Sequence, residues 1–394
     1  MPVLFTQNCS ASSFPIRKTM NQNDIRSSRT ATTGRMATPH SLRWRSRIIA
    51  ICGLVILLPI IMVFAMSVGS ADYSFITIWK IILSQLPFID LTDNFDVNEL
   101  GRIEDAILQT RLPRVVLGGL VGSALAVAGA TYQGLFRNPL ADPYLIGVSQ
   151  GALLGAVIGF LIAFGNQEIS QFGPVPVFAF VGAIAAVLAV YFIARTGRSL
   201  PVTTLILAGV ALGAALSAIT QYLIIASGDS DLHSKVMLWM FGHIEDEWTK
   251  VLYTFPFMIV GTMIIWFYSR SLNVMQLDEE QAEQLGINVE RVKVILLVCS
   301  TLVTAAAVAF CGTIGFVGII IPHTVRLIWG PDHRFLLPLA TLVGAIFLIL
   351  ADTLVRFARP FTGAEEIPIG VITAAIGAPF FLYLLRKKKR GTYF

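Results

Sequence analysis

Residues 115–136 read VVLGGLVGSALAVAGATYQGLF, an uninterrupted run without a charged side chain. A helix needs about 20 mostly apolar residues to cross a bilayer, so this run is long enough to span one. In the whole chain of 394 residues, 55% are hydrophobic and only 13% are charged, whereas about 25% are charged in an ordinary soluble domain. The composition excludes a soluble enzyme, a secreted disulfide scaffold and a disordered protein. It predicts an all-α membrane protein.

Nine further apolar runs give a total of ten predicted membrane-spanning helices. In chain order these are Ile48–Val68, Val115–Phe136, Leu145–Phe164, Val175–Ala194, Val202–Ala226, Val251–Tyr268, Val292–Cys311, Ile314–Trp329, Leu336–Val355 and Ile367–Leu385. The eighth is the weakest, because it contains a proline, a histidine and an arginine. An even number of spans places both termini on the same side of the membrane.

The basic residues predict which side that is. The two terminal segments and the loops on their side hold 21 of the 29 basic residues and 8 of the 24 acidic residues. Cytoplasmic loops carry an excess of Lys and Arg, so both termini are predicted to be cytoplasmic in a multi-pass cell-membrane protein. This distribution also explains the net charge of +5 without nucleic acid as a partner.

The first 47 residues are polar and rich in Ser, Thr, Asn and Arg, without apolar periodicity. Such a segment buries too little surface to offset the entropy of ordering, so residues 1–47 are predicted to be a disordered basic cytoplasmic tail. No apolar region follows the first charges, unlike in a cleavable signal peptide. Met20 and Met36 stand as alternative start sites. Residues 48–390 then form the transmembrane domain.

Small residues recur at intervals of four in several predicted spans. The third span carries Gly147, Gly151, Gly155 and Gly159, which share one helix face. The second, fifth and tenth spans show the same spacing. Lipid supplies no hydrophobic drive between helices, so close packing relies on such small residues. The pattern predicts a tightly packed, rigid bundle.

No catalytic motif interrupts the apolar pattern. The sequence contains no HExxH zinc motif, no GxxxxGK[ST] phosphate loop and no GxSxG nucleophile motif. Its four cysteines show no CxxC spacing. Acidic residues inside spans, which proton-driven transporters need, are nearly absent. We therefore expect no enzyme activity, no cofactor and no bound metal, and we expect the energy for any transport to come from a separate protein.

The segment from Leu272 to Lys293, LNVMQLDEEQAEQLGINVERVK, is the most acidic stretch on the predicted inner side. Asp278, Glu279 and Glu280 favour the start of a short helix, because carboxylates stabilise a helix N-terminus.

The same segment carries apolar residues and a helix stop. Ala282 and Leu285 would give the short helix an apolar face, and Gly286 would end it. This coupling elbow, residues 272–293, is predicted to be a helix–glycine–helix knob that fits a groove of a partner. A solvated turn between two spans is the alternative.

Seven motifs lie in order along residues 111–385. They are Arg111-Leu-Pro-Arg114, QGLFRNPLADPYLIGVS from Gln133 to Ser149, Ala282…Leu285-Gly286, GTIGFVG from Gly312 with Pro322, His323 and Arg326, Asp332-His-Arg334, Asp352…Arg356, and Ile367-Pro-Ile-Gly370. On these motifs the chain resembles the FecCD-type permeases of ATP-binding-cassette (ABC) importers for iron–siderophore, haem and cobalamin.

The resemblance implies the ten-helix fold of the type II ABC importer permease class. It also implies a second permease copy, as a homodimer or heterodimer with the pathway between the copies. The other implied partners are a dimer of cytoplasmic ABC ATPases and an extracytoplasmic substrate-binding protein. The independent count of ten spans and the charge-derived orientation agree with this arrangement in the lipid bilayer.

The resemblance assigns a docking role to three arginines on the predicted outer side, Arg111, Arg114 and Arg356. In the family, such arginines receive carboxylates of the binding protein, and the planar, permanently charged guanidinium suits bidentate carboxylate contact. The alternative is pairing inside the chain with Glu104, Asp105 or Asp352.

The resemblance also assigns roles on the inner side. The elbow from Asp278 to Gly286 would enter a cleft of the ATPase and pass its movement to the bundle. The inner gate would be formed by two groups of residues, Asn138-Pro139-Leu140 and Val202-Thr203. An ordinary structural turn is the alternative for the first group.

The function expected from these features is that of a permease subunit translocating a metal chelate, with an iron(III)-siderophore as the first candidate. Cobalamin or haem carried by the same architecture is the alternative. A secondary transporter that works alone is disfavoured by the missing intramembrane acids, and a membrane-embedded enzyme by the missing catalytic clusters.

Overall fold

The structure is a computed structural model that describes residues 40–69, 73–85, 97–163, 173–197, 199–362 and 367–389. Within these ranges the secondary structure consists of helices joined by turns and irregular segments, with an isolated β-bridge between Thr196 and Ser199. The predicted all-α class is therefore confirmed. The chain divides into two units, Met1–Arg45 and Ser46–Phe394, and the contacts described below all lie within the second.

The helical elements follow one another along the chain. They are α2 (His40–Ser67), α3 (Phe75–Ser84), α4 (Val97–Asp105), the π-helical η1 (Ala106–Arg111), α5 (Leu112–Leu135), the 3-10 helix η2 (Pro143–Ile146), α6 (Val148–Ala163), α7 (Pro174–Ala194), α8 (Val202–Ser227), α9 (Ser230–Met240), α10 (Trp248–Phe267), α11 (Ser269–Val274), α12 (Glu279–Gln284), α13 (Val289–Cys311), α14 (Val317–Trp329), α15 (His333–Thr362) and α16 (Ile369–Lys389).

Each of the ten predicted spans coincides with a helix. Seven helical stretches are long and apolar enough to cross a membrane, in α2, α4 to α5, α7, α8, α10, α13 and α15. The apolar parts of α6, α14 and α16 are shorter, so crossing by these three stays a prediction. Helix α2 begins at His40, inside the predicted tail, and residues 1–39 of that tail lie outside the described residues.

Two predicted spans begin too early. The third was expected from Leu145, but Gly147 has a φ of +85° and separates η2 from α6. The eighth was expected from Ile314, but the chain stays irregular until Phe316, whose φ is +68°, and α14 starts at Val317. Apolar composition continues through both breaks, so hydropathy alone did not reveal them. The sequence also did not predict helices α3, α4 and α9.

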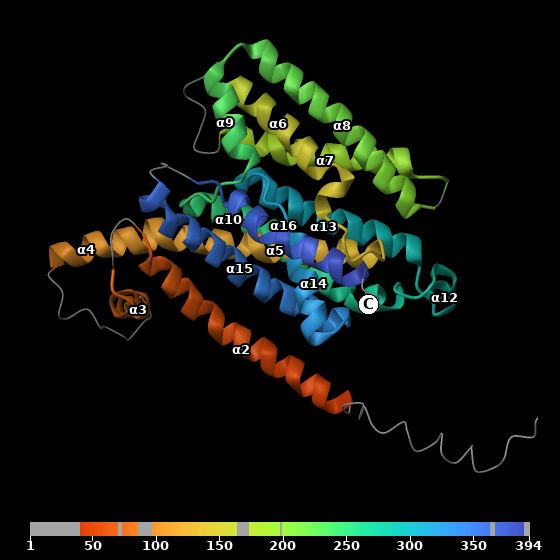
Figure 1. Cartoon of the computed structure of the whole chain (residues 1–394), viewed down its shortest axis with the longest axis horizontal. Coiled ribbons are helices and arrows are strands. Elements are labelled where there is room, and N and C mark those ends of the chain that lie inside the picture. The colour runs from red at the N-terminus through yellow and green to blue at the C-terminus, as the bar shows by residue number, and fades with distance from the viewer. Residues whose placement is uncertain are drawn as a thin grey trace, which may run out of the picture. The chain divides into compact units, whose positions relative to one another are not determined.

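Helix α5 forms the centre of the bundle and packs against α10, α13, α14 and α15 (Figure 1). Most of its residues are buried. The contacts are close because small residues meet across them. A Cβ atom on Gly122 would collide with the carbonyl of Gly344 in α15, and one on Gly129 would collide with that of Gly318 in α14.

The glycine stripe of the third span has the predicted role. A Cβ atom on Gly151 would collide with Gly182 of α7, and one on Gly155 would collide with Phe178. On Gly159 it would lie 2.7 Å from the Cα atom of Val175. Helices α6 and α7 therefore touch backbone to backbone, and α8 packs on both at one edge of the bundle (Figure 1). This confirms the tight packing expected from the sequence.

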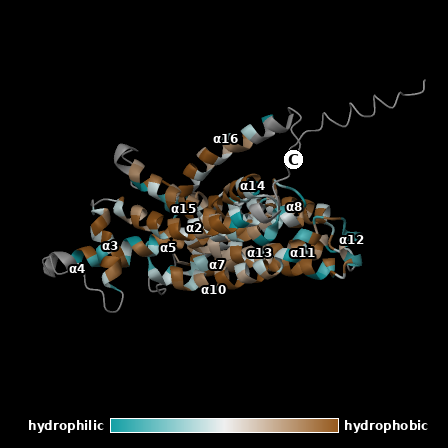
Figure 2. Cartoon of the chain, turned by 90° about the horizontal axis from the view of Figure 1, so that it is seen from below, coloured by the Kyte–Doolittle hydropathy of each residue, from teal (hydrophilic) through white to brown (hydrophobic). Residues whose placement is uncertain are grey.

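The outer faces of the helices expose large apolar side chains, among them Ile225, Tyr222, Leu252 and Phe267. Soluble proteins rarely expose contiguous apolar surface on this scale. Figure 2 shows the apolar colouring along the bundle and the hydrophilic colouring at α12. This surface suits contact with lipid, and the hydrophilic elbow suits water.

Candidate functional site

Two of the three predicted docking arginines, Arg114 and Arg356, pair with one buried carboxylate. Asp352 lies in α15 with a side chain that is only 4% exposed. Arg114, in the first turn of α5, donates from Nε and NH2 to its Oδ1 atom at 3.1 and 2.9 Å. Arg356 donates from Nε to Oδ2 at 3.0 Å. Two guanidinium groups thus share the carboxylate, which satisfies a charge that would otherwise be costly to bury.

The same arginines hold the end of α2. Arg356 donates from NH1 to the carbonyl of Val68 at 2.6 Å. Arg111 donates from NH1 to the carbonyl of Met66, also at 2.6 Å, and its guanidinium lies 4.7 Å from the centre of the Tyr73 ring. The three arginines therefore join the end of α2, the start of α5 and α15.

The structure thus brings together Arg111, Arg114 and Arg356, the three residues to which the resemblance assigns docking. It also shows that Asp352, one of the three acids offered as internal partners, pairs with Arg114 and Arg356. The side chain of Arg114 keeps 20% of its surface exposed. Internal pairing and contact with a partner are both compatible with this partial exposure, so the docking role stays a prediction.

The coupling elbow has the predicted helix–glycine–helix form. Gly286 follows α12 with a φ of +83°, a left-handed conformation that favours glycine. Its N–H donates to the carbonyl of Glu283, and the N–H of Ile287 donates to that of Ala282. These are the two hydrogen bonds of a Schellman motif, and they end the helix sharply.

The two apolar residues of the elbow face opposite ways. Ala282 is fully buried against the bundle, whereas 65% of Leu285 is exposed. Asp278, Glu279 and Glu280 are exposed at the N-terminal end of α12. The elbow therefore presents two exposed leucines, Leu277 and Leu285, beside a cluster of carboxylates, which is a surface suited to contact with another protein.

Polar contacts fix the elbow to the neighbouring ends of other helices. Gln276 donates from Nε2 to the carbonyl of Gly134 at 2.9 Å. Asn273 donates from Nδ2 to Oδ1 of Asp332 at 2.7 Å and accepts from the backbone N–H of His333 at 2.8 Å. The turn between α14 and α15 is thereby tied to α11.

Asp332 is a strongly held carboxylate at this turn. Partial burial alone would raise its pKa, but hydrogen bonds from Arg334 and Asn273 outweigh this effect and lower the pKa to about 2. The side chain also accepts from the backbone N–H of Arg334 and so caps the start of α15. The motif residues Asp332 and Arg334 therefore act in holding the fold.

The first predicted gate group lies in a tight turn after α5. Arg137 has a φ of +48° and closes α5 with a second Schellman motif. Asn138 then accepts from the N–H of Leu140 at 3.0 Å through its Oδ1 atom. Pro139 and Leu140 are half-buried, and Asn138 is exposed. The structural-turn alternative describes this geometry, and a gating role stays a prediction.

The next residues of the same motif hold η2. Asp142 accepts from the N–H of Tyr144 at 2.8 Å. Burial raises the pKa of Asp142 to about 6, although this hydrogen bond acts in the opposite direction. The hydroxyl of Tyr144 donates to the carbonyl of Ile314 and accepts from the N–H of the same residue, both at 3.2 Å. The motif thus connects η2 to the irregular segment before α14.

The second predicted gate group begins α8. Val202 is half-buried and Thr203 is exposed in its first turn. Helix α8 packs against η2, where a Cβ atom on Gly209 would lie 2.8 Å from the Cα atom of Ile146. The first gate group precedes η2 and the second begins α8, and these two helices are in contact.

Two residues of the quoted segments have contacts that the sequence analysis did not predict. Gln133, buried in α5, donates from Nε2 to the carbonyls of Gly318 and Ile319 in α14. Lys293 is almost fully buried and pairs with two carboxylates. A glutamate three residues before Lys293 was visible in the sequence, but such a pair is common on exposed helices and gave no sign of burial.

These observations define a class of protein. A helical, apolar-surfaced bundle with a polar elbow at one end has the features of a multi-pass membrane transport protein. The comparisons with known proteins agree, and the chain belongs to the FecCD transport family, whose family model matches residues 54–387.

Several known proteins resemble the chain over most of its length. It is 46% identical over 280 residues to the cobalamin import system permease protein BtuC of Halobacterium salinarum, covering 71% of this chain and 73% of the relative. It is 38% identical over 325 residues to the Fe(3+)-citrate import system permease protein YfmD of Bacillus subtilis, covering 82% and 90%.

A solved structure shares the fold. It is described as a metal-chelate type ABC transporter in an inward-facing conformation. The two chains are 31% identical with a TM-score of 0.72, and the match covers 86% of this chain and 98% of the other. The chain is thus a permease of the ABC importer type and is not itself an enzyme.

Proposed function

We propose that this chain is the transmembrane subunit that passes a metal chelate from an extracytoplasmic binding protein to the cytoplasm, driven by a separate dimer of ABC ATPases. The observation that carries the proposal is the elbow, where an exposed Leu285 and three carboxylates project beside a Schellman turn. A second permease copy, as homodimer or heterodimer, would complete the pathway.

In this proposal both termini and the elbow lie in the cytoplasm. Support comes from the excess of basic residues on that side and from the hydrophilic elbow at one end of the bundle (Figure 2). Arg111, Arg114 and Arg356 then lie on the outer side, where the binding protein docks. Asn138, Pro139, Leu140, Val202 and Thr203 form the inner gate.

The elbow is tested with Gly286→Pro. Proline fixes φ near −65° and lacks an N–H, whereas Gly286 has a φ of +83° and donates to Glu283 at 2.9 Å. We expect ATP hydrolysis stimulated by the binding protein to be lost in the reconstituted complex. The matched control is Gly228→Pro, because Gly228 ends α8 with a φ of +64° and a similar N–H contact.

Both variants disturb a helix end in the same way, but only one disturbs the elbow. Stimulated hydrolysis that survives in Gly286→Pro, with the ATPase still co-purifying, would remove the elbow from the coupling mechanism. Equal loss in both variants would assign the effect to a general fault in folding.

The first substrate to test is an iron(III)-siderophore, since a relative named for iron(III)-citrate import shares 38% of its aligned residues with this chain. Cobalamin is the second candidate to test. The 46% identity to the relative named for cobalamin import supports this candidate. Proteoliposomes containing the permease, its ATPase and its binding protein should accumulate one labelled chelate in an ATP-dependent manner. Uptake of neither chelate would exclude both assignments.

A further inference from the structure

A buried lysine joins the elbow to the bundle. Lys293 lies in the first turns of α13, and its side chain is only 3% exposed. Its Nζ atom lies 2.9 Å from Oε1 of Glu279 in α12 and 3.0 Å from Oε1 of Glu290, one turn earlier in α13. An ammonium group is costly to bury unless carboxylates surround it. The pairing therefore holds Glu279, and with it the elbow helix, against α13.

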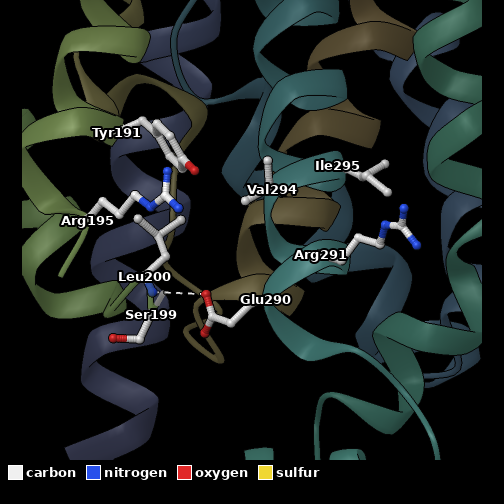
Figure 3. Close-up of a pocket in the computed structure, with 8 residues that line it drawn as sticks. All are labelled: Tyr191, Arg195, Ser199, Leu200, Glu290, Arg291, Val294 and Ile295. Atoms are coloured by element: carbon white, nitrogen blue, oxygen red, sulfur yellow. Dashed lines mark hydrogen bonds between the residues drawn. The ribbon is translucent and has the colours of Figure 1, made fainter. Parts of the chain in front are cut away.

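The second oxygen of Glu290 extends the contact to another segment. Oε2 accepts from the backbone N–H of Leu200 at 2.9 Å, as Figure 3 shows. Leu200 belongs to the loop between α7 and α8 and lies two residues before Val202. Glu290 thus joins the start of α13 to the loop that leads into the second gate group.

On the other side of the elbow, Arg137 completes the set. Its NH1 atom lies 3.3 Å from Oδ1 of Asp278, and its NH2 atom lies 3.9 Å from Oε1 of Glu279. Arg137 directly precedes the first gate group, and its left-handed backbone is fixed by the turn that closes α5. The N-terminal end of α12 is therefore held between Arg137 and Lys293.

We propose that Arg137, Glu279, Lys293 and Glu290 form an ion-pair relay that transmits movement of the elbow to both gate groups. The relay rests on the proposed function, in which an ATPase moves the elbow. Charge-assisted hydrogen bonds have defined geometry. A shift of α12 therefore pulls on the turn after α5 through the bond from Arg137 to Asp278 and, through Lys293 and Glu290, on the loop before α8. Packed elements joined in this way move as rigid bodies between discrete arrangements.

These four residues are positioning residues, since none needs to touch the chelate. The variants Glu279→Gln and Lys293→Gln each break the same link, between the elbow and α13. Glu279 keeps 48% of its side chain exposed, and after Glu279→Gln the buried Lys293 still pairs with Glu290. This variant therefore tests the relay even if Lys293→Gln does not fold. Lys293→Arg preserves the charge and should retain the coupling.

The matched control is Arg291→Gln. Arg291 lies on the same helix as Lys293, outside the stretch from Asp278 to Gly286 that is proposed to enter the ATPase. It is exposed and points away from Glu290 in Figure 3. The Arg291→Gln variant removes one positive charge near the relay without changing a residue of the relay. We expect it to import as much chelate per ATP as the wild type.

The experiment measures ATP-dependent uptake of labelled chelate and ATP hydrolysis in the same proteoliposomes. We expect Glu279→Gln and Lys293→Gln to lower the chelate imported per ATP at least tenfold while the ATPase remains bound and hydrolyses ATP. Because both variants break the Glu279–Lys293 pair, the loss in the double variant should be smaller than the product of the two single losses. A purely structural role would lower uptake and hydrolysis together and leave their ratio unchanged.

The relay would be overturned if Glu279→Gln imported as much chelate per ATP as the wild type. It would also be overturned if the loss of import per ATP in the double variant equalled the product of the two single losses. Failure of the relay is distinguishable from failure of the proposed function. If the wild-type complex binds no ATPase or imports no chelate, the proposed function is wrong. If the wild type imports and the variants match it, only the relay is wrong.

Discussion

The arginines around Asp352 allow a quantitative prediction. In the variant Arg114→Gln, Asp352 loses a guanidinium that approaches it from two nitrogen atoms, at 3.1 and 2.9 Å from Oδ1. The carboxylate is only 4% exposed, so water cannot replace the lost donors fully. The contact from Arg356 at 3.0 Å remains.

The expected cost follows from these contacts. Removing one partner of a buried ion pair costs about 3–5 kcal/mol. Because Arg356 still pairs with Asp352, and because Arg114 is itself partly exposed, we expect a lower value of about 2 kcal/mol. At about 1.4 kcal/mol for each factor of ten, this is roughly a thirtyfold change in the folding equilibrium.

The assay is unfolding of the purified permease in detergent, followed by tryptophan fluorescence. The control is Arg102→Gln, an exposed arginine of α4, which should change the stability by less than about 0.5 kcal/mol. If Arg114→Gln were as stable as this control, the pairing with Asp352 would not hold the fold and Arg114 would be available for docking. Affinity for the binding protein, measured at low and high salt in the same variants, then tests docking separately.

Two further predictions concern packing and pH. Gly129→Leu places a side chain against the backbone of Gly318. It should destabilise the protein by at least about 1–3 kcal/mol and lower its yield. The control is Gly53→Leu in α2, where a Cβ atom meets no atom within 4 Å; its stability and yield should match those of the wild type. Burial raises the pKa of Asp142 to about 6, so the folded state binds this proton more tightly than the unfolded chain, whose carboxyl titrates near about 4. The free energy of unfolding should therefore fall as pH rises from about 4 to about 6. Asp142→Asn, in unfolding measured across that range, should remove this part of the pH dependence. A pH profile identical to that of the wild type would contradict the raised pKa of Asp142.

The sequence by itself determined the helical membrane class and the position of most helices. Long apolar runs and four-residue glycine spacing act locally, within one helix, so they can be read without knowing its neighbours. The elbow was predictable for the same reason, since an acidic helix start and a terminal glycine are signals of a single turn. The breaks at Gly147 and Phe316 were not predictable, because apolar residues continue through them.

The tertiary structure alone decided which charges pair. Arg114 and Asp352 are 238 residues apart in the chain. The sequence around each residue does not distinguish an arginine that pairs within the chain from one that binds another protein. The sequence around Lys293 likewise gives no sign that its side chain is buried. The burial follows from the packing of α12 beside α13, where Glu279 pairs with Lys293. Local sequence fixes the period and the ends of a helix, but the burial of a charge depends on which distant helix packs against it, and only the assembled bundle decides that.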